Sequence, residues 1–232
     1  MCQGCVEIES QMTLSAPPQH GKPKFNLGRA LQILGLILLV GAVAFGVKVY
    51  LHLRPYYDEA QAVDLSKFRE YAHQDAIALE KVPRHMIDAV VAAEDPQFFE
   101  SEGPSTISQQ LARTNHVRSY RGMLVNVFLA YRIVRNLSKA QIIEMYLNRT
   151  YFGSGYYGIN DASKGYFGKA ASGISIDQAA TLAGLIRSPD ALSPINHPEA
   201  CKAARDHVLA RMEEQKMITE ETKDRLVALP VR

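Results

Sequence analysis

Glu94 is the first residue whose type and position suit catalysis. It follows Val90 and Val91 by one helical step in the segment that Pro83 opens, on the apolar face of a predicted helix. Burial and the negative end of a helix dipole both disfavour a charged carboxylate, so we expect a raised pKa for Glu94. Such a group can act as a general base near neutral pH. A structural glutamate in a salt bridge is the alternative.

A run of hydroxyl and amide side chains follows, and it reads Ser105-Thr106-Ile107-Ser108-Gln109-Gln110. Thr106 and Gln109 have the spacing of a capping box, which predicts a helix start at Thr106. A helix N-terminus lined with hydroxyls suits an anionic group, and an ordinary helix cap explains the same pattern.

Positive charge is concentrated between Glu102 and Glu144, where six cations occur without one Asp or Glu. These cations are Arg113, Arg118, Arg121, Arg132, Arg135 and Lys139. The distribution favours a polyanion, either a pyrophosphate or an acidic lipid surface. Aromatic residues are sparse among them, which argues against a nucleic-acid partner.

The elements that must position these residues are helices, because apolar residues recur at helical spacing and no alternation of period two is sustained. The repeats are Leu124, Val127, Phe128 and Tyr131; Ile142, Ile143, Tyr146 and Leu147; and Ala200, Ala204, Val208 and Met212. Ser175 with Gln178 forms a second capping box. We therefore predict a mainly α domain with loops at Gly153–Gly158 and Ser188–Pro198.

Ala30 to Val47 is a run of 18 residues without a charge, bracketed by Arg29 and Lys48. As a helix it reaches about 27 Å, close to the hydrocarbon thickness of a bilayer. A buried core helix or a cleaved signal peptide would be the alternatives, and an uncleaved single-pass anchor is our prediction. The cations before the run favour a cytoplasmic N-terminus and an outer C-terminal domain.

Three regions follow from this organisation. We predict a disordered cytoplasmic arm over residues 1–28, an anchor with a juxtamembrane segment over 29–54, and a folded domain over 55–232. The chain has 232 residues, 47% of them hydrophobic and 22% charged, with a net charge of +2, which excludes intrinsic disorder and collagen-like repeats. Its three cysteines form neither a disulfide framework nor a zinc site.

Several ordered motifs resemble the family 51 peptidoglycan glycosyltransferases. They are EDPQFF from Glu94, STISQQLAR from Ser105, LSKAQIIEMYLNRTYFG from Leu137, YGINDASKGYFGKAASGISIDQAATLAGLIRSP ending at Pro189, and HVLARMEEQKMIT ending at Thr219. The resemblance covers roughly Val82 to Thr219. No transpeptidase domain follows, so the chain looks like the monofunctional type.

The resemblance implies a lysozyme-like, mainly α domain on the outer face of the bacterial cytoplasmic membrane. It implies lipid II as substrate, Glu94 as the base that deprotonates the acceptor hydroxyl, and inverting transfer with release of undecaprenyl diphosphate. We add Arg121, near a lost family cation, to the substrate-binding residues that the motifs imply. The full set is Asp95, Phe98, Ser105, Thr106, Gln109, Gln110, Arg113 and Arg121.

The same resemblance suggests a divalent cation, Mg or Mn, that bridges the diphosphate, with no organic cofactor and no residue assigned as a metal ligand. The expected partners are lipid II, nascent glycan, the lipids of the membrane and possible other proteins of cell-wall synthesis, with no nucleic acid.

The chain departs from the family pattern at three places. Ser101 stands where the family has histidine, and Gly103 leads almost directly into Ser105, without an intervening stretch of roughly two dozen residues that the family has there. A family cation and its second essential glutamate fall on Met123 and Asn126. Loss of a partner carboxylate costs an enzyme several kcal/mol of transition-state stabilisation. The sequence therefore leaves two hypotheses, an active polymerase and a catalytically impaired relative that binds lipid II, glycan or synthesis partners.

Overall fold

The computed structural model describes residues 27–68, 75–114 and 120–231. These residues form helices and turns without a β-strand, and Tyr151 and Tyr157 make an isolated antiparallel bridge. The predicted mainly α class with a preceding apolar helix is confirmed. The chain divides into two units, residues 1–50 and residues 51–232.

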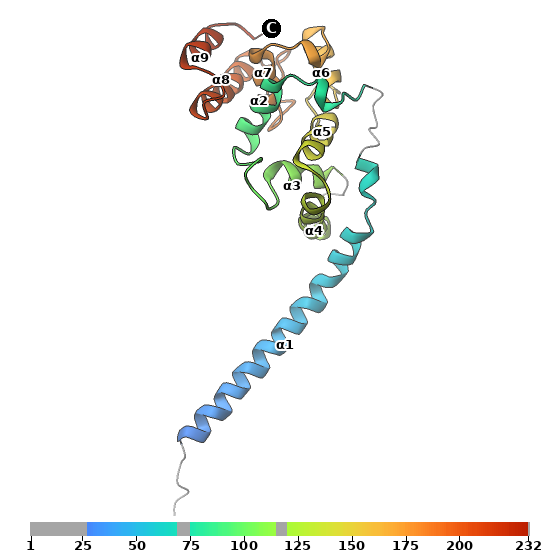
Figure 1. The fold of residues 1–232 in the computed structure, drawn as a ribbon, viewed down its shortest axis with the longest axis vertical. Coiled ribbons are helices and arrows are strands. Elements are labelled where there is room, and N and C mark those ends of the chain that lie inside the picture. The colour runs from blue at the N-terminus through green and yellow to red at the C-terminus, as the bar shows by residue number, and fades with distance from the viewer. Residues whose placement is uncertain (1–26, 69–74, 115–119, 232) are drawn as a thin grey trace, which may run out of the picture. The chain divides into compact units, whose positions relative to one another are not determined.

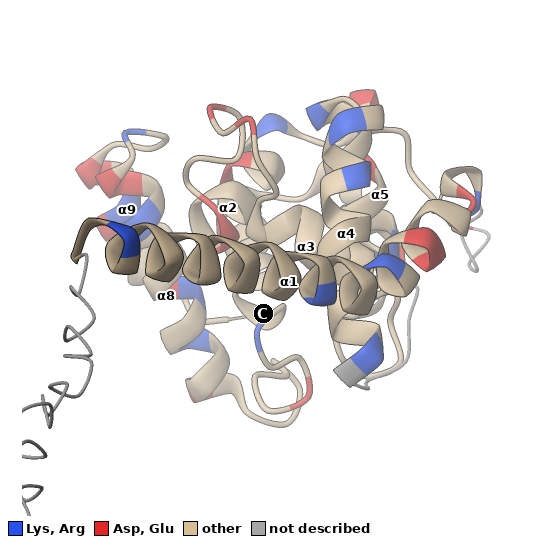
Figure 2. Ribbon diagram, turned by 90° about the horizontal axis from the view of Figure 1, so that it is seen from below, with Lys and Arg blue, Asp and Glu red and all other residues tan. Residues whose placement is uncertain are grey.

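Helix α1 runs from Leu27 to Ala62 and belongs to both units. It is long and apolar enough to cross a membrane, and charged residues lie only outside its Ala30–Val47 core (Figure 2). The helix continues past Pro55, so the boundary predicted between residues 54 and 55 falls inside it. The predicted arm over residues 1–28 lies almost wholly outside the described residues.

The second unit is built from eight further α-helices and three short 3₁₀ helices within the described residues. They are η1 (Leu65–Phe68), η2 (Leu79–Lys81), α2 (Arg84–Glu94), α3 (Thr106–Arg113), α4 (Tyr120–Asn136), α5 (Lys139–Arg149), α6 (Ile159–Phe167), η3 (Ala171–Gly173), α7 (Ile176–Leu185), α8 (Pro198–Glu214) and α9 (Glu220–Val227). The predicted Ser175–Gln178 capping box begins α7, and a second box, Ser138 with Gln141, begins α5. Helix α6 ends at Gly168, whose left-handed backbone (φ +69°) terminates a helix without a side-chain clash.

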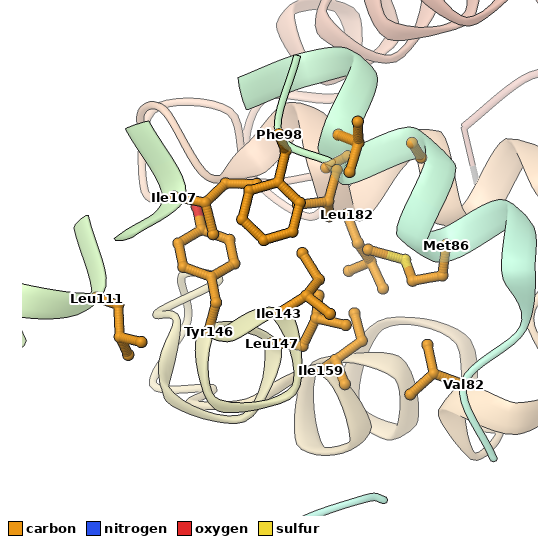
Figure 3. Close-up of a cluster of buried hydrophobic side chains, with 14 of the residues drawn as sticks. Val82, Met86, Phe98, Ile107, Leu111, Ile143, Tyr146, Leu147, Ile159 and Leu182 are labelled. Atoms are coloured by element: carbon orange, nitrogen blue, oxygen red, sulfur yellow. The ribbon is translucent and has the colours of Figure 1, made fainter. Parts of the chain in front are cut away.

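The helices of this unit pack in two groups (Figure 1). Helices α2, α7 and α8 pack on one another, with α9 against α8, while α3 packs on α4 and α5. Helix α6 contacts both α5 and α7 and so joins the groups. Side chains from both groups meet in the core (Figure 3); they include Met86, Phe98, Ile107, Ile143, Tyr146 and Leu182.

The apolar repeat predicted on α4 is helical, but only part of it packs against the core, as Phe128 does. The structure buries Val125, Leu129 and Ile133, whereas Val127 and Tyr131 of the predicted face are 46% and 56% exposed. Apolar residues lie on the exposed side of α4 as well as on its buried side, so the helical spacing alone does not select the buried face. Packing against α3 decides between them.

The predicted face of α8 is confirmed only in part. Val208 and Met212 are buried, but Ala200 is exposed, and Cys201 and Arg205 lie inside instead. The fully buried guanidinium of Arg205 is compensated by the Asp206 carboxylate at 2.7 Å and by the backbone carbonyls of residues 227, 229 and 230.

Candidate active site

Glu94 is the last residue of α2 and is partly buried, as its position in the sequence predicts. Gln110 of α3 donates a hydrogen bond from Nε2 to Glu94 Oε2. Tyr146 of α5 in turn donates from its hydroxyl to Gln110 Oε1 at 3.0 Å. This chain of two hydrogen bonds crosses from the α2 group of helices to the α3 group, so the carboxylate lies where the two groups meet.

The predicted direction of the Glu94 pKa is supported by these surroundings. Burial raises the pKa, and the Gln110 hydrogen bond and the positive charges of Arg211 and Arg187 offset part of the rise. Arg211 of α8 also donates from a guanidinium nitrogen to the Ala93 carbonyl at 2.9 Å, which caps the C-terminus of α2. The sequence analysis missed both arginines, because each lies more than 90 positions from Glu94.

Asp95 holds the segment after α2 against the start of α3. Its Oδ2 accepts from the Thr106 amide at 3.2 Å and its Oδ1 from the Gln97 amide at 3.2 Å. The start of α3 that the sequence offers to an anionic ligand is thus engaged by the chain's own carboxylate. This arrangement fixes Glu94 from its C-terminal side.

The cap of α3 differs from the prediction. Ser105 is the N-cap, and its hydroxyl accepts from the Ser108 amide at 3.1 Å. Thr106 is therefore the first helical residue, and the expected capping box with Gln109 does not form. A hydroxyl one position earlier caps the helix through the Ser108 amide in place of the Gln109 amide, so the spacing alone did not determine the register.

Two of the predicted substrate-binding residues lie inside the protein. Phe98 is fully buried, and Ser105 is only 4% exposed as a helix cap. Both therefore support the site from within rather than offer a surface to a ligand. Thr106, Gln109 and Arg113 are exposed along α3, on the same helix as Gln110.

Lys139 is the first residue of α5 and lies beside the segment after α2. The sequence analysis counted it among the cations but did not place it at the site. Its Nζ is buried without a hydrogen-bond partner and lies 4.8 Å from the centre of the Phe98 ring. Burial lowers the pKa of Lys139, and the nearby Asp95 charge offsets part of that effect. The ammonium group thus supports the Asp95–Phe98 segment electrostatically.

Arg121 occupies a different place from the one predicted. Its guanidinium pairs with Glu59 of α1 at 2.8 Å and 3.0 Å, and it lies over the Tyr56 ring. It therefore ties α4 to the end of α1, and its assignment as a substrate-binding cation stays a prediction. Arg118, another cation of the same stretch, lies outside the described residues.

Helix α4 carries no charge at the two positions where the family pattern has a cation and a carboxylate. Met123 is 54% exposed, and the side-chain oxygen of Asn126 is buried without a hydrogen-bond partner. No group of three or more Asp, Glu, His or Cys residues that suits a metal occurs in the described part of the chain. With both oxygens of Asp95 engaged, this donor set does not fit a protein-held divalent cation.

Comparisons with known proteins identify the family of the chain. The Transglycosylase family model matches residues 99–213. Penicillin-binding protein 2a of Streptococcus pneumoniae is 33% identical over 220 residues, which cover 82% of this chain and 30% of that protein. A candidate transglycosylase of Cupriavidus necator is 30% identical over 227 residues, which cover 87% of this chain and 96% of that protein.

A crystal structure of penicillin-binding protein 1A from Haemophilus influenzae aligns with a TM-score of 0.48 and 25% identity, over 68% of this chain and 18% of that one. The chain thus spans about a third or less of the length of the penicillin-binding proteins that it matches, and nearly all of the Cupriavidus protein. The resemblance drawn from the motifs is confirmed, and the chain belongs to the transglycosylase family, family 51 of the glycosyltransferases.

Proposed function

We propose that this chain is a membrane-anchored peptidoglycan glycosyltransferase that joins lipid II units into glycan strands. Membership of the transglycosylase family supports the reaction class. The observation that carries the proposal is Glu94, a partly buried carboxylate with a raised pKa, held by Gln110 at the junction of α2 and α3. A base of this kind gains a proton readily as the reaction proceeds.

Glu94 takes the proton of the acceptor GlcNAc 4-hydroxyl, and the freed electron pair attacks the anomeric carbon of the donor. The new C–O bond forms opposite the diphosphate, the bond from C1 to the diphosphate oxygen breaks, and its electron pair leaves with undecaprenyl diphosphate. Attack from the opposite face inverts the anomeric configuration. Burial favours the neutral form of Glu94, which stabilises the base once it holds the proton.

Positive charge for the leaving diphosphate comes from the exposed side chains of Arg113 and Arg187. A guanidinium can bind phosphate oxygens through two parallel hydrogen bonds. A divalent cation carried by the diphosphate would neutralise the same oxygens. Because the described residues do not fit such an ion, no step of this mechanism passes through a metal.

We propose that α1 anchors the chain in the bacterial cytoplasmic membrane, with the second unit on the outer side. An outer domain would meet the disaccharide of lipid II at the face where glycan strands assemble. The uncharged core of α1 and the cations that precede it in the sequence support this topology. A reporter fused at Arg232 should be active only outside the cytoplasm, and cytoplasmic reporter activity would reject the orientation.

A second candidate is a relative that binds lipid II or glycan without polymerising it. Helix α4 favours it, because Asn126 and Met123 supply neither a carboxylate nor a cation. Proton transfer from the acceptor would then rest on Glu94 alone, without a partner group to balance charge.

Purified full-length protein with labelled lipid II distinguishes the two candidates. A polymerase converts the label into a ladder of glycan strands, whereas a binder retains labelled lipid II and yields no ladder. If the protein forms no polymer and binds no lipid II, both proposals are rejected.

A further inference from the structure

Tyr146 lies in the core with its hydroxyl directed at the site. The residue is 2% exposed, and its ring lies beside Ile107 and Phe98 (Figure 3). Burial, together with the negative charge of Glu94, raises the pKa of Tyr146, so the phenol stays protonated and can donate. A buried hydroxyl is costly unless it has a partner, and here that partner is Gln110 Oε1 at 3.0 Å.

The chemistry of the three side chains gives the hydrogen bonds one direction. An ionised carboxylate can only accept, so the amide of Gln110 must present Nε2 to Glu94. Oε1 then faces α5, where only a donor can meet it, and the Tyr146 hydroxyl is that donor. If the amide were reversed, its oxygen would lie against the carboxylate.

We infer that Tyr146 is a positioning residue for Glu94, which fixes the end of the Gln110 amide that faces the carboxylate. Its catalytic meaning rests on the proposed role of Glu94 as base. Donation to Oε1 also polarises the amide and strengthens the bond from Nε2. Tyr146 thus acts on Glu94 through Gln110 and takes no proton itself.

The other groups that act on Glu94 are Arg211 of α8 and Arg187, which follows α7. Both are positively charged, and neither is hydrogen-bonded to Gln110 or Tyr146 in the described structure. Thr150 also lies at the Tyr146 side chain, and its hydroxyl donates to the Tyr146 carbonyl at 2.7 Å. Removal of the phenol oxygen therefore changes the hydrogen bonding of Glu94 while both neighbouring charges stay.

The test is a double-mutant cycle read by the pKa of Glu94, measured by carboxyl ¹³C NMR on the full-length chain. The Glu94 signal is assigned with Glu94→Gln. Tyr146→Phe and Gln110→Leu should each raise the pKa of Glu94, because each removes or weakens a hydrogen bond to the charged form. In the double variant, Tyr146→Phe should add nothing to Gln110→Leu.

Tyr166→Phe is the matched control, because it also removes a phenol oxygen, which bonds to the Phe152 carbonyl at 3.0 Å. It should leave the pKa of Glu94 unchanged. An unchanged Glu94 pKa in Tyr146→Phe overturns the inference, and so do effects that add in the double variant.

Wild-type protein provides a second measurement if Tyr146→Phe does not fold. Slow hydrogen exchange at the Gln110 side-chain amide, with a signal that titrates with Glu94, supports the inference, whereas a freely exchanging amide overturns it. These readouts need no lipid II, so they stand whether or not the chain polymerises it. In an active protein, Tyr146→Phe should also move the acidic limb of the pH–rate profile to higher pH.

Discussion

The junction of α2 and α3 and the Met123–Asn126 part of α4 lie in one domain but differ in their polar and charged side chains. At the junction, Glu94, Gln110 and Tyr146 form a connected set, and Asp95 is held through both of its oxygens. On α4, the oxygen of Asn126 has no hydrogen-bond partner, although it is buried. A buried polar atom without a partner costs stability, and each region has one, because the Lys139 ammonium beside Phe98 is also without a hydrogen-bond partner. The two regions differ instead in that the junction holds two carboxylates in hydrogen bonds, whereas Asn126 and Met123 of α4 supply no charge.

The surroundings of Glu94 do not depend on the charges of α4. The groups that hold Glu94 come from α3, α5, α8 and the end of α7. Helix α4 packs its other face, through Leu129 and Ile133, against the core. Charges on the solvent side of α4 can therefore be exchanged without disturbing the contacts of Glu94.

The largest expected effect is that of Glu94→Gln. The amide keeps the size of the side chain but cannot take a proton, so lipid II polymerisation should fall at least about a hundredfold. Circular dichroism and lipid II binding should stay near wild type. Glu214→Gln, at an exposed position of α8, is the control and should keep full activity. Equal activity of wild type and Glu94→Gln would reject Glu94 as the base.

Asn126→Glu combined with Met123→Lys should return to α4 the carboxylate and the cation of the family pattern. Restoring a carboxylate and a cation should raise polymerisation about tenfold, which corresponds to about 1.4 kcal/mol of barrier. Val127→Glu with Tyr131→Lys places the same charges on exposed positions of α4 and should give no gain. If both pairs of substitutions change polymerisation equally, the positions of Asn126 and Met123 have no special role in activity.

Arg211→Met should remove a positive charge near Glu94 while it leaves the Glu94 carboxylate in place. Loss of the positive charge raises the pKa of Glu94 further, because Arg211 favours the ionised form. Activity near neutral pH should drop about three- to fivefold, and the acidic limb of the pH–rate profile should move to higher pH. Arg225→Met, on the exposed side of α9, should leave the profile in place. A profile unmoved by Arg211→Met would separate this arginine from the base.

The smallest effect concerns stability. A carboxylate whose pKa is raised on folding destabilises the folded state once the pH exceeds its unfolded value, and has no such effect where both states are protonated. Glu94→Gln should therefore raise the Tm at neutral pH by roughly 2 °C. The gain should vanish below about pH 4. A Tm gain of equal size at both pH values would point to packing instead of charge.

Sequence reasoning found α2 and Glu94 because Met86, Val90 and Val91 recur at helical spacing and are all buried, which places Glu94 at the end of the same face. It failed in part on α4, where Val127 and Tyr131 have the same helical spacing as core residues but lie exposed, and tertiary contacts bury Leu129 and Ile133 instead. Motif membership placed Phe98 at the substrate, but an aromatic ring beside a site can equally fill the core below it.

Arg187, Arg211 and Tyr146 escaped prediction for another reason. Each acts on Glu94 from a helix or loop that is remote in sequence, and periodicity within one segment carries no information on such contacts. Tyr146 did show its burial in the apolar repeat of α5. Only the fold shows that its hydroxyl is directed at Gln110.

The hydrogen bond from Arg211 to Ala93 joins residues 118 positions apart, whereas Gln110 reaches Glu94 across only 16. Closure of a long loop costs more entropy than closure of a short one, so contacts of high sequence separation tend to form late in folding. During synthesis, the α2–α3 contact is available long before α8 has left the ribosome. We therefore expect Glu94 to acquire its Gln110 partner first and the neighbouring Arg211 last, so that a chain that has not yet docked α8 has incomplete surroundings at Glu94.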